Sequence, residues 1–174
     1  VEYFNYVLND SRNFLDLIDS DYTFLNEELA NHYGIAGVEG KEMRKVQLTD
    51  RRRGGVLGMG SVLASTSMPL RTSPVLRGKW VLEEIMGTPP PPPPPDVGEL
   101  PEAASHKKDA NLRQLLEAHR AKPTCANCHQ KMDPIGFGLE NFDPLGRWRD
   151  SYGDEPIIAW DTLPSGEVFK GPED

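Results

Sequence analysis

Apolar residues recur at helical spacing in several segments of the chain, and clusters of turn-forming residues separate these segments. Near the N-terminus, Asp10-Ser11 precedes an apolar group at positions 14–18, and Asp21 precedes a second group that ends near Gly34. Short polar side chains accept hydrogen bonds from the first amides of a helix, and glycine commonly follows its last turn. The pattern therefore predicts a helical segment over residues 1–48.

The middle of the chain contains the clearest helix start. Ser73-Pro74 places a capping hydroxyl before a proline at the first helical position, and Gly87 is placed to end the helix beyond Ile85. Upstream, the apolar run Val56–Ala64 contains small residues that permit another segment to approach closely. Seven consecutive prolines, Pro89 to Pro95, then divide the chain. They favour polyproline II, so we expect a stiff strap across a domain surface, with a docking site for a proline-recognising partner as the alternative.

The last part of the chain begins with a helical pattern and ends without one. Four residues share one face of a predicted helix over 111–120, namely Leu112, Leu115, Leu116 and His119. Lys122-Pro123 is expected to end this helix, a short helix is expected around 139–142, and 151–174 is expected to be irregular. The predicted fold is mainly α and loop-rich. A small helical domain spans 49–150, and it has a helical N-terminal extension and a polyproline strap.

Charge and composition narrow the possible partners. The chain has 174 residues, a net charge of −8, 16 prolines and 16 glycines. An acidic chain lacks the clustered basic surface that nucleic acids require, and Arg51-Arg52-Arg53 is its one basic run. No stretch approaches the roughly 18 apolar residues of a membrane span. We therefore expect neither nucleic-acid binding nor a membrane span.

The pentapeptide Cys125-Ala126-Asn127-Cys128-His129 carries the most specific chemistry. Cys-x-x-Cys-His is the attachment pattern of a c-type haem: two thiols bind the porphyrin edge, and the histidine binds the iron. The chain has two cysteines, and both lie in this motif. The motif therefore predicts one covalent haem c, attached at Cys125 and Cys128, with His129 as the proximal iron ligand.

Other chemistries use similar motifs. A Cys-x-x-Cys pair also serves thioredoxin-like redox sites, but no strand pattern precedes this one. A structural zinc site would need two histidines beside the cysteines, and the spacings fit no finger pattern. A disulfide across so short a loop would restrain the unfolded chain little.

The segment after His129 suggests how the proximal histidine is held. Asp133-Pro134 and the residues up to Gly138 have the composition of a proline loop. Such a loop would turn the chain beneath the ring and offer a carbonyl to the second imidazole nitrogen. Asp133, Glu140 and Asp143 are interpreted as turn and capping residues rather than as an acid pair.

The sixth iron ligand is open at this stage. Met132 lies too close to His129 in sequence to reach the opposite face of a haem. His119 is a candidate because it lies on the apolar face of the preceding helix, and Met68 is the alternative because it precedes Pro69 in a loop-like stretch. Met59 or an open position would complete the possibilities.

Several motifs in a fixed order resemble the planctomycete-type cytochrome c domain of large exported proteins. They are the segment from Arg71 to Trp80, the segment from Gly87 to Pro95, Cys125–His129, and the segment from Asp133 to Asp143. The resemblance covers about residues 50–150. It implies that 1–48 is the tail of a preceding domain and that 151–174 begins a following one. It also implies a periplasmic or extracellular protein whose signal peptide is not in this chain.

We expect the haem pocket to draw on residues that flank the motif. These are Pro134, Ile135, Phe137, Leu139, Phe142, Trp148, Arg71 and Arg77. The favoured function is an electron-transfer module whose partner is a redox protein or a neighbouring domain of the same polypeptide. The alternative is a catalytic haem of peroxidase or oxidase type, with an open distal side served by Arg71, Arg77 or a histidine. No nucleophile elbow, metalloprotease helix or phosphate loop is present.

Overall fold

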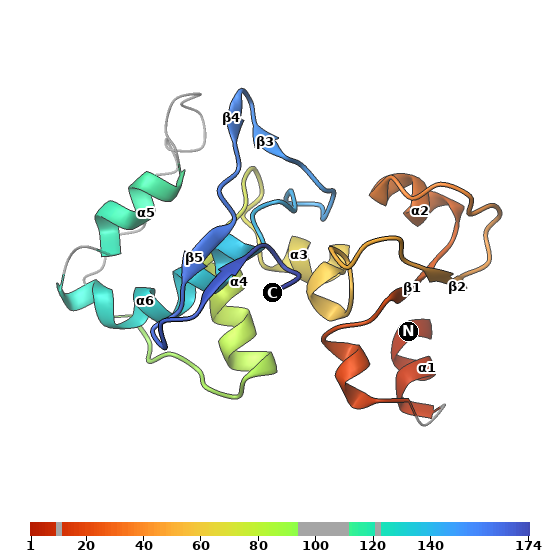
Figure 1. The fold of residues 1–174 in the computed structure, drawn as a ribbon, viewed down its shortest axis with the longest axis horizontal. Coiled ribbons are helices and arrows are strands. Elements are labelled where there is room, and N and C mark those ends of the chain that lie inside the picture. The colour runs from red at the N-terminus through yellow and green to blue at the C-terminus, as the bar shows by residue number, and fades with distance from the viewer. Residues whose placement is uncertain (10–11, 94–111, 121–122) are drawn as a thin grey trace.

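The computed structural model describes residues 1–9, 12–93, 112–120 and 123–174, and it is mainly helical and loop-rich, as predicted (Figure 1). The helices are α1 (Glu2–Asn9), α2 (Glu27–Tyr33), α3 (Gly60–Ser65), α4 (Pro74–Trp80), α5 (Leu112–Arg120) and α6 (Pro123–Gly138). Shorter helical turns are η1 (Phe14–Leu17), η2 (Val56–Gly58) and the π-helical η3 (Val81–Ile85). The strands are β1 (Tyr22–Leu25), β2 (Arg44–Gln47), β3 (Ser151–Tyr152), β4 (Glu155–Pro156), β5 (Trp160–Thr162) and β6 (Val168–Lys170).

The N-terminal segment is less helical than the sequence pattern predicts. Tyr22–Leu25, expected inside a helix, forms strand β1, which pairs with β2 in antiparallel register from Tyr22↔Gln47 to Leu25↔Arg44. The run Tyr-Thr-Phe contains the β-branched and aromatic residues that favour strands. The helix that follows, α2, starts later than predicted because Asn26, not Asp21, is its cap. It ends where expected, at Gly34 with a φ of 72°. Asp10-Ser11 lies outside the described residues.

The helix predicted from Ser73-Pro74 is confirmed. The Ser73 hydroxyl accepts a hydrogen bond from the Leu76 amide at 3.3 Å, and α4 continues directly into η3. Met86 donates its amide to the Val81 carbonyl five residues earlier, the bond that defines a π-helical turn. Gly87 follows with a φ of 62°.

The prediction of a proline loop after His129 is wrong. Helix α6 continues through Pro134 to Gly138, although a proline inside a helix has no amide to donate to the carbonyl four residues earlier. Close packing against α4 holds this part of the helix. The short helix expected around 139–142 is also absent. Leu139, Glu140 and Phe142 instead donate their amides to carbonyls three residues earlier, as in successive tight turns.

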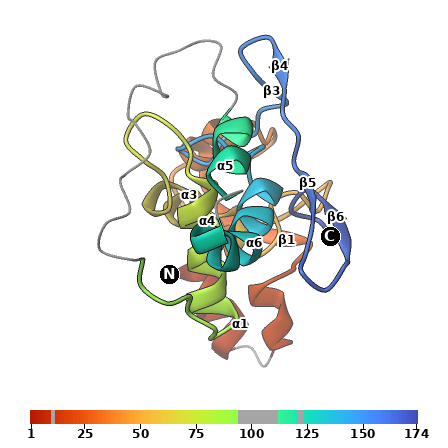
Figure 2. The same cartoon turned by 90° about the vertical axis from the view of Figure 1, so that its left-hand side faces the viewer.

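The C-terminal segment was expected to be irregular, but it contains two short antiparallel pairs. Strand β3 pairs with β4, and β5 pairs with β6 from Trp160↔Lys170 to Thr162↔Val168. Strand β5 lies along α6, as two views show (Figures 1 and 2).

The proline strap is described only in part. Residues 89–93 form no helix or strand, and Pro94 and Pro95 lie outside the described residues. Across the described ranges, no helix is both long enough and apolar enough to cross a membrane.

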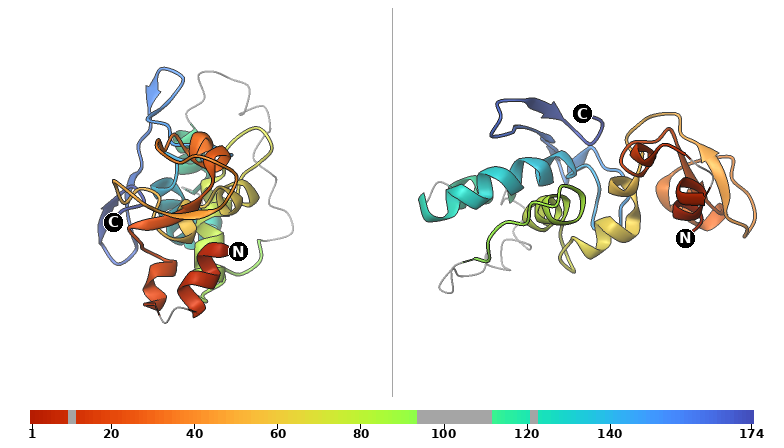
Figure 3. Two further views of the ribbon diagram at one scale, coloured as in Figure 1. Left: turned by 90° about the vertical axis from the view of Figure 1, so that its right-hand side faces the viewer. Right: turned by 90° about the horizontal axis from the view of Figure 1, so that it is seen from below.

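The core lies where α3, the start of η3 and the turn that follows α6 meet. Its buried residues are Leu63, Val81, Leu139 and Phe142. The elements of the first 48 residues lie at the opposite end of the molecule from α5, with α3 between (Figures 1 and 3). They have their own small clusters, one around Tyr3 and Tyr22 and one around Leu25 and Ala30. Helix α6 therefore connects the core at one end with the cysteine motif at the other.

Candidate functional site

The cysteine–histidine motif lies on the N-terminal half of α6. Pro123 is the first residue of the helix, and Cys125, Cys128 and His129 follow at offsets of three and four positions. Helical residues with these offsets lie on the same face. Both cysteines are partly exposed. The helix therefore presents two thiols and one imidazole together on one side.

The imidazole is held by a carboxylate one turn further along α6. His129 Nδ1 lies 2.9 Å from Asp133 Oδ1, and the Asp133 side chain is fully buried while that of His129 is 16% exposed. With the Asp133 carboxylate oxygen as acceptor, Nδ1 is the donor, and Nε2 is then the ring nitrogen that carries the lone pair a metal would bind. The expected carbonyl from a proline loop is replaced by this side chain. The sequence interpretation of Asp133 as a turn residue is wrong, because 133 lies inside the helix.

The second carboxylate oxygen of Asp133 indicates that a positive charge is needed at this site. Oδ2 is buried and has no hydrogen-bond partner among the described residues. A buried carboxylate with an unsatisfied oxygen is costly unless a cation lies nearby. A metal ion bound to His129 would supply that charge, so the residues present fit a metal-containing group on the imidazole.

Helix α4 packs closely against the face of α6 that carries the motif. A side chain at Gly78 would collide with the backbone of Met132, and one at Gly136 would collide with the backbone of Pro74. Because 74 lies opposite 136 and 78 lies opposite 132, the two helices are antiparallel. The continuation of α4, η3, contributes Val81 to the hydrophobic core, and Ile85 packs against that core.

Four of the eight residues predicted to line a haem pocket lie in or against the hydrophobic core. Leu139 and Phe142 are buried there, and Ile135 and Trp148 pack against them. The Phe142 and Trp148 rings meet edge to face with centroids 5.2 Å apart. These residues follow His129 by six to nineteen positions and gather at the other end of α6.

Arg77 is a buried clamp on the turn that follows α6. Its side chain is 1% exposed, and its guanidinium donates hydrogen bonds to the carbonyls of Leu139 at 2.6 Å and Phe142 at 2.8 Å. It also donates to the Asp143 carbonyl at 3.0 Å and to the Ser67 hydroxyl at 3.1 Å. Burial lowers the pKa of Arg77 to about 10, although the carboxylate of Glu140 opposes the shift. These bonds tie α4 to the 139–143 turn.

Further charged side chains surround Arg77, and the sequence analysis did not predict their arrangement. Glu140 accepts a hydrogen bond from the Thr72 hydroxyl at 2.8 Å and lies 3.4 Å from the Arg149 guanidinium. Burial raises the pKa of Glu140, and Arg77 and Arg149 oppose that shift. Arg71, also named as a pocket residue, donates to the Thr72 carbonyl at 3.1 Å. The two sequence segments 71–80 and 133–143 thus bind each other.

The structure does not bring Met68 together with His129. Met68 forms an isolated bridge with Arg71, and its neighbour Ser67 accepts from Arg77 at the core end of α6. Leu139, which the same guanidinium binds, lies ten residues beyond His129, about 15 Å along the helix. Met59 packs in the N-terminal cluster of Tyr3 and Tyr22. The side chain of His119, on α5, lies outside the described part of the structure.

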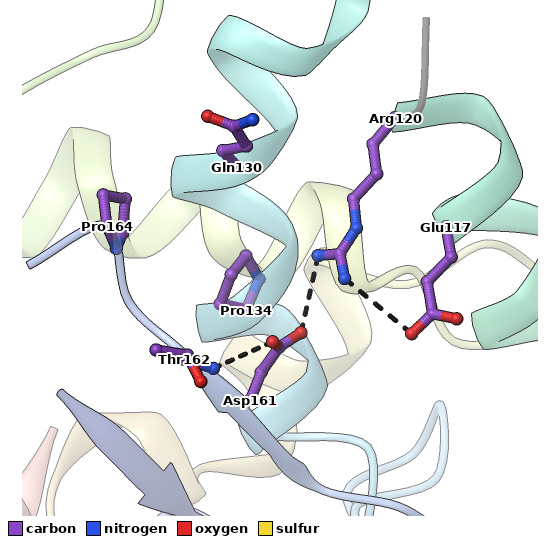
Figure 4. A pocket seen from close by; sticks show the side chains of 7 residues that line it. All are labelled: Glu117, Arg120, Gln130, Pro134, Asp161, Thr162 and Pro164. Atoms are coloured by element: carbon purple, nitrogen blue, oxygen red, sulfur yellow. Dashed lines mark hydrogen bonds and ion pairs between the residues drawn. The ribbon is translucent and has the colours of Figure 1, made fainter. Parts of the chain in front are cut away.

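A polar hollow of about 440 Å³ lies beside α5, α6 and β5. Figure 4 shows its lining residues, which are Glu117, Arg120, Gln130, Pro134, Asp161, Thr162 and Pro164. At about 100° per residue, Gln130 and Pro134 lie on the side of α6 opposite the cysteines. Phe137, another predicted pocket residue, has the Arg113 guanidinium 4.5 Å from its ring centre. Both Pro134 and Phe137 therefore belong to the packing between α5 and α6.

Ion pairs also connect α5 with β5 at this hollow. Asp161 Oδ2 lies 3.1 Å from the Arg113 guanidinium and 3.4 Å from that of Arg120. Over the described ranges, no group of three or more His, Cys, Asp and Glu side chains is arranged to hold a metal ion. The motif therefore offers one imidazole with a supporting carboxylate and two thiols, rather than a closed cage of ligands.

Comparisons with known families match two parts of the chain. Residues 53–152 match the family described as "PSCyt3: Protein of unknown function (DUF1588)", and residues 1–35 match "PSD4: Protein of unknown function (DUF1592)". These names denote planctomycete cytochrome-type domains that are uncharacterised. Searches of curated proteins and of solved structures give no match. Since the first match covers more than half of the chain, the chain belongs to the PSCyt3 (DUF1588) family.

Proposed function

We propose that the chain is an electron-transfer module that carries one covalently attached haem c within a larger exported protein. The observation that carries this proposal is the Cys-x-x-Cys-His motif on one face of α6, with His129 Nδ1 bound to the buried Asp133 carboxylate at 2.9 Å. Cys125 and Cys128 would form the thioether bonds, and His129 Nε2 would bind the iron. Haem, when bound, supplies a one-electron couple.

The conformation of this chain prepares the imidazole for such a role. The carboxylate bond fixes the tautomer and the direction of the ring, as outer partners of metal-binding histidines generally do. Both residues lie on one helix, so their relative position depends on a rigid element rather than on a loop. Partly exposed thiols at the start of α6 leave the attachment edge accessible to the surface. An exposed edge suits transfer to a redox protein or a neighbouring domain.

The hydrogen bonds made by the predicted distal arginines favour electron transfer over catalysis. Arg77 is committed to three carbonyls and the Ser67 hydroxyl, and Arg71 binds the Thr72 carbonyl. A peroxidase-like site needs a mobile polar group over an open iron position, and the buried, multiply bonded Arg77 does not have that freedom. We retain His119 as the candidate sixth ligand because α5 packs against α6, and we no longer favour Met68.

Maturation of the chain with a bacterial haem-attachment system tests this function. The expected product keeps a Soret band after denaturation, and Cys125→Ala/Cys128→Ala loses it. Lys131→Ala, an exposed change on the same helix, should keep the haem. A purified protein that contains zinc and no Soret band would contradict the proposal.

Two further measurements separate the remaining alternatives. The absorption spectrum of both oxidation states should be low-spin, and His119→Ala should make it high-spin. Rapid turnover of peroxide by the wild-type chain would instead support a catalytic haem. An unchanged spectrum in His119→Ala would exclude that residue as the ligand.

A further inference from the structure

Asp133 differs from the other buried carboxylates in what it binds. Asp161 is paired with two arginines, and Glu140 lies between Arg77 and Arg149. Asp133 is fully buried, and within the described ranges its one side-chain hydrogen-bond partner is the imidazole of His129. No arginine or lysine of the described residues balances its charge.

The position of this charge is fixed by the fold. Asp133 and His129 lie one turn apart on α6, and the next residues of that helix are held against α4 by the close approach of Gly136 to Pro74. Met132, the neighbour of Asp133, meets Gly78 in the same way. The backbone that carries Asp133 therefore cannot shift without disturbing the contact between the two helices.

From this geometry we infer that Asp133 is a positioning residue that lowers the reduction potential of the haem, an inference that rests on the proposed function. A carboxylate that accepts the Nδ1 proton raises the basicity of the other ring nitrogen. A more basic imidazole and a nearby negative charge both favour ferric over ferrous iron, because the ferric state carries one more positive charge. Burial strengthens the effect, since water screens the charge less.

The chemical class of the redox partner follows from a low potential. A centre that is stable in its oxidised form gives up its single electron readily. The partner that receives this electron is then a redox protein or domain of higher potential. The acidic chain, with a net charge of −8, would meet such a partner through a basic surface.

The test uses the full chain with its haem attached. Asp133→Asn removes the charge but keeps an oxygen that can accept from Nδ1. Its midpoint potential should rise so that the equilibrium constant for reduction increases about tenfold, which is about 59 mV for one electron. Asp143→Asn is the matched control, because it removes a carboxylate that is 16% exposed and lies in the turn beyond the far end of α6, and its potential should stay at the wild-type value. A potential unchanged in Asp133→Asn would overturn the inference.

A second measurement needs no charge-removing variant. Resonance Raman spectra after photolysis of the carbon monoxide complex report the iron–histidine stretch. Wild type should show the raised frequency of an imidazole bound to a carboxylate, and so should Asp133→Glu. A frequency typical of an imidazole bound to a neutral carbonyl would refute the role of Asp133, even if Asp133→Asn fails to fold. Absence of any covalent haem in wild type would refute the proposed function instead, so the two failures are distinguishable.

Discussion

Residues 132–138, at the C-terminal end of α6, are bound to α4 backbone against backbone, whereas residues 123–129 carry two partly exposed thiols and an imidazole. The first region leads directly into the buried core and into the turn whose carbonyls Arg77 binds. The second has one carboxylate behind its histidine. A single helix thus joins a rigid end to a chemically reactive end. Placing reactive groups on an element that is fixed elsewhere gives precise geometry without burying the groups themselves.

Substitution at the contact between α4 and α6 should have the largest effect. A methyl group at Gly136 would occupy the space of the Pro74 carbonyl, so Gly136→Ala must push the helices apart. We expect a loss of about 3 kcal/mol or more in the free energy of unfolding, measured by urea titration. Lys131→Ala, exposed on the same helix, is the control and should change stability by less than about 0.5 kcal/mol. Equal stability of the two variants would contradict the view that this end is rigid.

Removal of the Arg77 guanidinium should have the second-largest effect on the free energy of unfolding. Arg77→Met fills similar space but leaves the carbonyls of Leu139, Phe142 and Asp143 without their donor. Buried acceptors that lose their partner cost about 1–3 kcal/mol, so we expect a loss of about 3 kcal/mol in all. Arg77→Lys keeps the charge but not the forked geometry, and an intermediate loss is expected. A Met variant as stable as wild type would show that packing alone holds the turn.

Hydrogen exchange should report the difference between the two ends directly. In Cys125→Ala/Cys128→Ala, which cannot attach the proposed haem, the amides of residues 127–129 should exchange about tenfold faster than in the wild-type chain after haem maturation. The amides of Phe137 and Gly138 should change much less, because their helix end is held by α4 in both proteins. A uniform change along α6 would show that its ends respond as one unit.

Local signals predicted local features of the fold correctly. Ser73-Pro74 marks the start of α4 because a cap acts within one turn, and Gly34 ends α2 for the same reason. Strand β1 depends on a partner that lies some twenty residues further along the chain, so its own pattern did not reveal it. Helix α6 continues through Pro134 because α4 packs against it. That contact joins distant segments, so the residues next to Pro134 do not reveal it.

The site was predictable in the same uneven way. The motif at 125–129 is visible in the sequence, whereas its supporting carboxylate is not, because the proline at 134 suggested a loop. Had the helix been assumed to continue, the spacing of four residues between His129 and Asp133 would have revealed the pair. Phe142, predicted to line a haem pocket, lies in the hydrophobic core, and sequence alone does not separate the two because a core and a pocket use the same apolar residue types.

Substitution of Asp143 should have the smallest effect on stability, and that effect should depend on pH. Its carboxylate accepts from the amides of Leu145 and Arg147 and pairs with the Arg147 side chain at 2.8 Å, so it holds the turn that closes the rigid end. Burial acts to raise the pKa of Asp143, but these bonds outweigh it and the pKa is lowered. A lowered pKa in the fold means that the stabilisation is complete above the ordinary aspartate value near 4 and is lost as pH falls through the folded value. Asp143→Asn should therefore be less stable than wild type by about 1 kcal/mol at pH 7, and the difference should shrink toward pH 3. Glu140 is present in both wild type and Asp143→Asn, so comparing their thermal midpoints at pH 7 and pH 3 isolates the contribution of Asp143. A difference in stability that persists at pH 3 would assign the effect to the shape of the side chain rather than to its charge.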